Sequence, residues 1–450
     1  MSSFSLRTAV IVLAGAVAAA ALAAAALHLR HRPAEDAASE RPEVPRFRYD
    51  VEYPAIRYTE TEPTARVARL AARLGSGETT LAFRKDRGYL EDLLRALDID
   101  PSSQALVFSK TSLQTDYVSP ETPRAIYFND DTYVAWEQGG PVIEIASLDP
   151  SLGFVFYTLR QSAPLSLGFV RQTTNCLRCH DTYELTGGGV PRLLLGSGYI
   201  GAKGDLVSHE GWILTTDETP LESRWGGWYV SGHHGDQVHL GNIVVHDPAE
   251  LQHLEKLRIG NLDDLDALLD TKPYLTNKSD IVALLVLQHQ ATVQNLLVRA
   301  SFDARQAQAA GSLTPATLDA AVEPLVRAML FVGAAKITAP IEGNSGFRQR
   351  FEASGPRDAQ GRSLRELDLT TRLFRYPLSF LIYSDAFDAL PDAVKARVYE
   401  RLAEILTGAD PSKDFASLSP EDRRAILEIL RATKPDFAAA AARLRPLKTA

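Results

Sequence analysis

Cysteine and methionine are the scarcest residue types in this sequence, which has only two of each among its 450 residues. Two cysteines exclude a small fold stapled by several disulfides, and they leave a structural zinc site without the second cysteine pair that it would need. An excess of basic charge is also lacking, because 48 Lys and Arg residues face 56 Asp and Glu residues and the formal net charge is -8. This balance argues against nucleic acid as a partner.

The two cysteines that are present lie three residues apart and are followed by a histidine, in the order Cys176, Leu177, Arg178, Cys179, His180. A c-type haem needs two thiols for its thioether bonds and a histidine that coordinates the iron, and this CxxCH spacing supplies all three from one short turn. A thioredoxin-like dithiol would open a helix after a βαβ pattern, which is not seen in the surrounding sequence. We therefore predict one covalent haem c, bound through Cys176, Cys179 and His180, with His180 as the proximal iron ligand.

The sixth position of the iron decides what such a haem does, because a strong ligand there makes an electron carrier and an open position admits a substrate or a gas. Methionine is a poor candidate. Besides Met1 there is only Met329, which lies far beyond the haem motif in a helical pattern where core packing explains it better. Histidine is therefore the expected distal ligand, and His289 and His239 are the candidates.

His289 lies at the centre of an apolar stripe on a predicted helix. A histidine that faces a core needs either a hydrogen-bonding partner or a metal, and the sequence leaves both interpretations open. The stripe is formed by Ile281, Leu285, Val293, Leu296 and Ala300.

His239 belongs to residues 225–242, which hold two tryptophans, five glycines and three histidines. Such a segment suits a loop that lies against a flat apolar surface, and the edge of a haem is such a surface. His239 is accordingly the second candidate, as the sixth ligand or as an acid–base group of the pocket. His233 and His234 are expected to be exposed loop residues.

Three arginines are candidate partners for the haem propionates, because a guanidinium pairs bidentately with a carboxylate. For each of them an ordinary surface position is the alternative. They are Arg178, Arg192 and Arg224.

The N-terminal segment from Ala9 to Leu27 is a run of 19 uncharged, small or apolar residues, long enough to span a bilayer. Its Ala-x-Ala triplets also allow cleavage as a signal peptide. Arg30 and Arg32 after it would favour a cytoplasmic C-terminal side by the positive-inside rule, but haem c is attached outside the cytoplasmic membrane. We therefore predict a single-pass anchor in a bacterial inner membrane, with the body in the periplasm.

The remaining pattern predicts an α+β fold with a membrane anchor or signal at 1–28, an extended tether at 29–50, a mixed α/β haem-bearing region at 51–260 and a helical region at 261–450. Strand-like runs occupy 105–109, 125–128, 142–145 and 154–159. Helical patterns occupy 62–74, 89–97, 248–258, 262–269, 280–300, 315–330, 393–406, 420–433 and 437–444.

Four segments together resemble uncharacterised bacterial membrane-anchored proteins with one cytochrome c domain. They are CLRCH (176–180), RWGGWYVSGHHG (224–235), VALLVLQHQATVQNLL (282–297) and RLFRYPLSFLIYSDAFDALP (372–391). The resemblance runs from about Leu106 to Leu430 and implies haem ligation by Cys176, Cys179 and His180. The chain differs from dihaem peroxidases, which need a second CxxCH, and from compact monohaem cytochromes, since some 400 residues surround its motif.

Two hypotheses follow for the function. The first is single-electron transfer by a six-coordinate haem to a periplasmic redox partner protein, which the tether and the lack of a substrate motif favour. The second is a haem enzyme, peroxidase-like or another oxidoreductase, with an open or displaceable sixth position, which the large non-haem portion favours. A gas or redox sensor would need an output domain, and none is visible.

Overall fold

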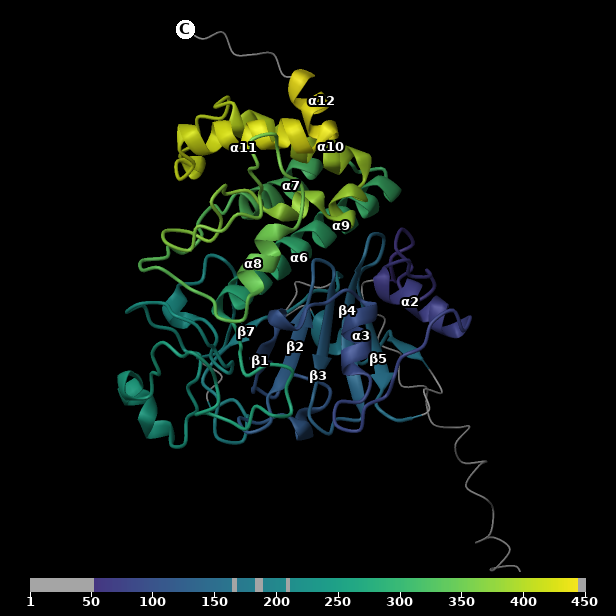
Figure 1. The fold of residues 1–450 in the computed structure, drawn as a ribbon. Helices are drawn as coiled ribbons and strands as arrows, with labels where there is room; N and C mark the ends of the chain where they lie inside the picture. Colours follow the sequence, from purple (N-terminus) through teal and green to yellow (C-terminus); the bar gives the residue numbers. More distant parts are fainter. Residues whose placement is uncertain (1–51, 164–167, 183–188, 208–210, 444–450) are drawn as a thin grey trace, which may run out of the picture. The chain divides into compact units, whose positions relative to one another are not determined.

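The structure, a computed structural model, describes residues 52–163, 168–182, 189–207 and 211–443 (Figure 1). Residues Tyr49–Ala450 form one compact unit, and the predicted anchor and tether lie outside the described residues. The predicted α+β class is confirmed, because the first half forms an antiparallel sheet and the second half is mainly helical.

The sheet is a six-stranded meander in which each strand is antiparallel to the next one in the sequence. All four predicted strand runs form strands, while the third and sixth strands were not predicted. The strands are β1 (Ala105–Val107), β2 (Arg124–Phe128), β3 (Thr132–Trp136), β4 (Val142–Asp149), β5 (Gly153–Arg160) and β6 (Phe169–Gln172).

The two faces of the sheet differ in burial, because successive side chains of a strand point to opposite faces and directly paired residues share a face. One face is fully buried and carries Ala125, Val134 and Ile145. The other face is only half-buried at its centre. It carries Arg124 and Ile126 of β2, Tyr133 and Ala135 of β3, Glu144 and Ala146 of β4, and Phe156 and Thr158 of β5.

Two short helices precede the sheet, α2 (Arg66–Gly75) and α3 (Leu90–Ala96), and α3 is seen in front of the strands in Figure 1. The chain entering α2 is tied to the sheet by Asp149 at the end of β4, whose Oδ2 accepts hydrogen bonds from the backbone N–H groups of Thr64 at 2.6 Å and Ala65 at 3.0 Å. A carboxylate in this place satisfies donors that a helix start leaves unpaired.

The helical half is organised around α6 (Ile281–Ala309), which is capped by the Asp280 side chain and packs against α7 and α10. This helix is long and apolar enough to cross a membrane, but 83% of its most apolar window is buried inside the protein, as in the core helix of a globular body. Six further α-helices follow: α7 (Pro315–Met329), α8 (Phe347–Ala353), α9 (Asp385–Asp388), α10 (Asp392–Leu406), α11 (Pro420–Thr433) and α12 (Pro435–Arg443).

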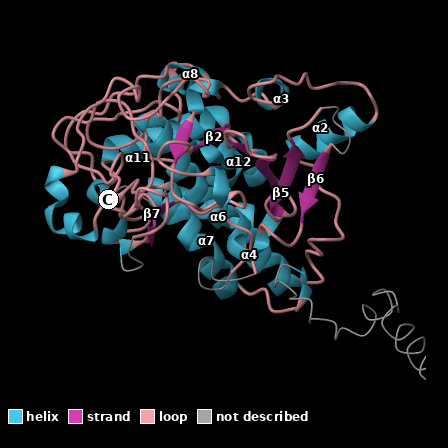
Figure 2. Cartoon of the chain, turned by 90° about the horizontal axis from the view of Figure 1, so that it is seen from below, coloured by secondary structure: helices cyan, strands magenta, loops and turns pink. Residues whose placement is uncertain are grey.

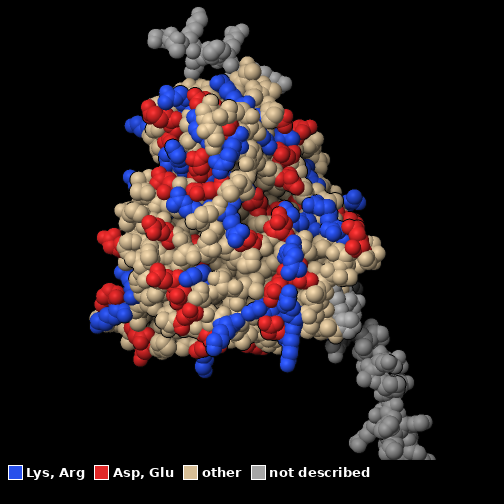
Figure 3. Space-filling model, in the orientation of Figure 1, with Lys and Arg blue, Asp and Glu red and all other residues tan. Residues whose placement is uncertain are grey.

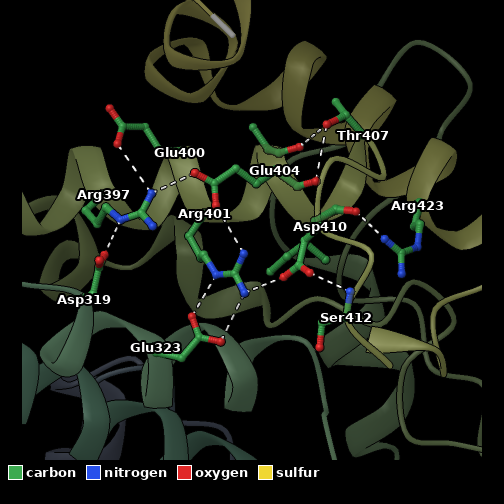
Figure 4. Close-up of polar contacts among 12 residues, drawn as sticks. Asp319, Glu323, Arg397, Glu400, Arg401, Glu404, Thr407, Asp410, Ser412 and Arg423 are labelled. Carbon is green, nitrogen blue, oxygen red and sulfur yellow. Dashed lines mark hydrogen bonds and ion pairs between the residues drawn. The ribbon is translucent and has the colours of Figure 1, made fainter. Parts of the chain in front are cut away.

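Charged side chains join α7 to α10 and to the loop that follows α10 (Figure 4). The Arg401 guanidinium donates to Glu323 of α7 at 2.8 Å and to Asp410 at 2.6 Å. One turn earlier, Arg397 donates to Asp319 at 2.5 Å and to Glu404 at 2.9 Å. A network of this kind holds its members more firmly than isolated surface pairs do.

The described residues between 189 and 280 are mostly loop (Figure 2), and they include a two-stranded antiparallel sheet of β7 (Gly196–Ser197) and β8 (Ile213–Leu214). The helix predicted at 262–269 is wrong. Its backbone groups pair with distant segments instead of along a helix, since Leu262 exchanges hydrogen bonds with Gly232 and the Leu265 N–H donates to the Asn277 carbonyl. The helix predicted at 248–258 is a kinked 3-10 helix, Pro248–Lys256.

Candidate functional site

The CxxCH motif forms the single helical turn α4 (Leu177–His180), and the backbone N–H of His180 donates to the carbonyl of Cys176 at 3.0 Å. Both cysteines are free thiols. Cys176, Cys179 and His180 all line one cavity of about 420 Å³. A volume of this size lies within the range of ordinary cofactor and ligand pockets.

The half-buried face of the sheet forms one wall of this cavity, with Ile126, Ala135, Ala146 and Phe156. The facing walls come from outside the sheet and are also apolar. They are formed by Leu193, Leu194 and Leu195, by Leu287 of α6, and by Trp212 and Trp228. Apolar walls with aromatic rings suit a flat macrocycle.

His180 is held in a fixed orientation by contacts with the backbone of Arg192. Its Nδ1 lies 2.5 Å from the carbonyl oxygen of Arg192, and the Arg192 N–H donates back to the His180 carbonyl at 2.9 Å. The carbonyl has no hydrogen to give, so Nδ1 carries the proton and the neutral ring keeps Nε2 as its lone-pair nitrogen. Burial lowers the pKa of His180 to about 4, which also keeps the ring neutral. The Phe156 ring packs 4.5 Å from it.

Arg124 is the cationic group best placed for a haem propionate, and the sequence analysis missed it. Its guanidinium lines the cavity with a side chain only 13% exposed, and its buried Nε has no hydrogen-bond partner. Its nearest carboxylate is Glu144, at 3.6 Å from Nη1. An unpartnered buried donor at a cavity wall fits an acidic group on the ligand. The sequence could have indicated this position, because Arg124 lies two residues before Ile126 and therefore on the same face of the strand β2.

The three predicted propionate partners lie elsewhere. Arg178 is exposed on α4 and does not line the cavity. Arg224 is buried, and its guanidinium donates to the carbonyls of Thr219 at 2.7 Å and Asp217 at 2.8 Å. Arg192 lines a second cavity of about 690 Å³, which shares with the first the wall formed by residues 193–195.

The structure places His289 in the core, away from the cavity that the haem motif lines. Both of its ring nitrogens have protein partners, because Nδ1 lies 2.7 Å from Oδ2 of Asp217 and Nε2 lies 2.9 Å from Oγ of Ser379. The ring stacks on Phe331 at 4.3 Å. These contacts are those of a hydrogen-bonded core histidine. The order Ser379, His289, Asp217 is that of a hydrolase triad, but the serine is fully buried, so no substrate reaches it.

His239 is also buried and also outside the lining of the cavity. Its ring packs 4.7 Å from the ring of His234 and 5.4 Å from that of Trp225, and neither of its nitrogens makes a hydrogen bond. Burial lowers the pKa of His239 to about 3. His234 is buried, contrary to the prediction, because the loop folds back over its own rings. His233 is half exposed beside Asp263, with its side chain 51% exposed.

Met329 is fully buried among core residues at the end of α7, the position that core packing predicts. Over the described ranges, no group of three or more His, Cys, Asp or Glu side chains is arranged to hold a metal ion by itself. A haem iron needs only one such ligand from the protein on its proximal side.

Comparison with known proteins finds no match for this chain among family models, curated proteins or solved structures. What the protein does must therefore be inferred from the site itself.

Proposed function

We propose that this protein is a monohaem c-type cytochrome, with its haem joined to Cys176 and Cys179 and its iron bound by His180. The observation that carries the proposal is the cavity that all three residues line, with the Nδ1 of His180 already committed to the Arg192 carbonyl. Two cysteines that were close by chance would not need a neighbouring histidine whose Nδ1 is hydrogen-bonded and whose Nε2 is left for a metal.

The bound haem would supply one-electron redox chemistry, and the chain's own residues prepare its surroundings. His180 stays neutral and fixed in direction, because burial and the Arg192 carbonyl act together. The Cys176 thiol stays protonated until it reacts, since burial raises its pKa to about 12. Arg124 has a free Nε that would suit a propionate, and the leucines at 193–195 would shield the bound group from water.

Of the two candidate functions, the cavity favours the haem oxidoreductase with an open or displaceable sixth position. Among the described residues that line it, His180 is the sole histidine and methionine is absent. A six-coordinate electron carrier would take its second strong ligand from one of these residue types. The remaining polar side chains of the lining include Lys110, Tyr133 and Glu144, which are weaker or less usual ligands. Single-electron transfer remains the alternative, and in both cases a redox partner protein supplies or removes electrons.

We further propose that the body faces the periplasm and is tethered to the bacterial inner membrane by residues 1–28, because haem c is attached on that side. Basic and acidic side chains are interspersed over the face shown in Figure 3. Together with the formal net charge of -8, this distribution supports a protein partner and not a nucleic acid.

Covalent attachment is tested by expressing the full chain in a bacterium that matures c-type cytochromes and measuring haem that survives denaturation. We expect one haem per chain in the wild type and almost none after Cys176→Ala or His180→Ala. His253→Ala, at an exposed histidine outside the cavity, is the matched control and should retain its haem. A wild-type chain that loses its pigment on denaturation would overturn the proposal.

The two functions are separated by the spectrum of the reduced protein with and without carbon monoxide. Rapid binding of carbon monoxide supports the open sixth position. An unchanged spectrum would contradict the open site and leave the electron carrier.

A further inference from the structure

Two glutamates with an unusual environment lie beside the proposed haem cavity. Glu144 lines the cavity from β4, and Glu137 follows β3 directly and is only 1% exposed. A fully buried carboxylate is rare unless it is paired or protonated.

One side-chain amide joins these two carboxyl groups. The Nε2 of Gln114 donates to Oε2 of Glu137 at 2.7 Å and lies 3.2 Å from Oε1 of Glu144. The amide itself is anchored on the edge of β4, because its oxygen accepts from the Val142 N–H at 3.1 Å. Gln114 thus holds the two carboxyl groups close together in a fixed arrangement.

The two carboxyl groups share one neighbouring cation, Arg124, and the three side chains are called the carboxyl cluster below. Arg124 lies 3.6 Å from Glu144, and the second oxygen of Glu137, Oε1, is buried without a hydrogen-bond partner. Two ionised carboxylates would leave this site with a net negative charge and with an unsatisfied charged oxygen. A single added proton makes the cluster neutral, since one carboxylate then balances Arg124.

The local electrostatics agree with this count. Burial, and after it the neighbouring Glu144, raise the pKa of Glu137 to about 8, although Arg124, Ser112 and Gln114 oppose the rise. These are the groups that face Glu137 from β2, from β4 and from the loop before β2. Besides burial, the charge of Glu144 also raises the pKa of the Cys176 thiol.

We propose that Glu137 and Glu144 hold one proton between them at neutral pH, and that at alkaline pH this proton is taken up and released with reduction and oxidation of the haem in the adjoining cavity. The inference rests on the proposed function for its second half. Reduction adds one electron to the cavity, and a proton from solvent joins the carboxyl pair, so that the charge added near the sheet is compensated.

The sign of the effect on the reduction potential follows from this linkage. An added negative charge nearby raises the affinity of the pair for a proton by a factor on the order of ten. Below the titration range of the pair both redox states hold the proton and the potential is flat. As the pH rises through that range, the oxidised form loses the proton first and the potential falls, by at most 59 mV per pH unit for one proton and one electron.

Redox titration of the holoprotein at a series of pH values tests the proposal. The wild type should show a potential that falls over a window starting near pH 8, where the pKa of Glu137 lies. Glu137→Gln keeps the shape and one hydrogen bond but removes the proton site, so the fall should disappear. Glu144→Gln removes the repelling neighbour, so the window should move to lower pH. Glu121→Gln, at an exposed glutamate, is the control and should behave as the wild type. Equal pH profiles for the wild type and Glu137→Gln would overturn the proposal.

A second measurement keeps this test independent of the proposed function. Infrared spectra of the purified full chain at pH 7 should contain the band of a protonated carboxyl group that Glu137→Gln removes and Glu121→Gln does not. This band does not depend on haem. A chain without haem but with the band would contradict the proposed function and leave the proton pair, while a chain with haem and without the band would refute the pair.

Discussion

Replacement of His289 by alanine separates the two roles that a buried mid-helix histidine can have. His289 is fully buried, and its ring makes two hydrogen bonds, at 2.7 Å to the Asp217 carboxylate and at 2.9 Å to the Ser379 hydroxyl. A hydrogen bond to a charged group contributes about 1.5–3 kcal/mol and a neutral one about 1 kcal/mol. The lost stacking on Phe331 adds a cavity cost. We therefore expect His289→Ala to lower the free energy of unfolding by about 3–5 kcal/mol.

The absorption spectrum of the haem should not change in the same variant. His289 does not line the cavity of Cys176 and His180, and both of its nitrogens are occupied. The assay is denaturant unfolding together with the reduced and oxidised spectra of the holoprotein. His289→Asn is the matched control, because its amide can still donate to Asp217 and should recover part of the lost stability. A spectrum that changes in His289→Ala while stability is retained would refute this reasoning and restore His289 as an iron ligand.

Three further predictions follow from the same structure. The folded-state pKa of His239, about 3, lies below its unfolded value of about 6.5, so its contribution to stability is complete above pH 6.5. That contribution is lost as the pH falls below about 6.5, by about 1.4 kcal/mol per pH unit. In His239→Gln the free energy of unfolding should therefore fall less steeply toward acid pH than in the wild type, and an equally steep fall would contradict this. Glu137 has a raised folded-state pKa, so the unfolded chain releases its proton first and its contribution to stability falls as the pH rises from about 4.3 to about 8. Glu137→Gln should therefore gain stability relative to the wild type between pH 4 and pH 8, and a difference between the two proteins that is the same at both pH values would argue against the shift. Asn295 accepts a hydrogen bond from the N–H of Leu193 at 2.9 Å and donates one to the Leu193 carbonyl at 2.8 Å. Asn295→Ala should lower the free energy of unfolding, measured with denaturant, by about 2 kcal/mol. A loss below about 0.5 kcal/mol would show that water replaces these two hydrogen bonds.

The strands and helices were predictable where their patterns are local. The runs that form β2, β4 and β5 are β-branched or aromatic and are bounded by Asp, Gly or Pro. The start of α11 carries a capping box at Ser419 and Asp422 together with a proline in its first turn. By contrast, β3 was not predicted, although four of its five residues, TYVAW, are β-branched or aromatic and so have the composition of a strand. It becomes a strand because β2 and β4 provide hydrogen-bonding partners on both of its edges.

The CxxCH motif predicted from local sequence that Cys176, Cys179 and His180 lie together, as they do at one cavity, but the surroundings of that cavity were not predictable. The Arg192 carbonyl that fixes His180 comes from a loop, and a backbone acceptor leaves no mark on residue type. Arg124 and Glu144 face each other because of the pairing of β2, β3 and β4, in which Ala135 is the partner of both Ile126 and Glu144. That register depends on where two turns fall. A shift of one residue would turn Arg124 away from the cavity.

The apolar stripe on α6 correctly predicted that His289 is buried. It could not predict which side of the core the His289 ring faces. Leu287 lines the haem cavity, while Ala291 and Asn295 line the second cavity. Each residue of a helix is rotated by about 100° from the one before it, so His289, two residues after Leu287, points to nearly the opposite side. A helix that is buried all round has a core on both sides, and a helical wheel does not distinguish them. Leu287 therefore bounds the cavity of Cys176 and His180 from this helix, and an apolar side chain there would suit the open sixth position proposed above.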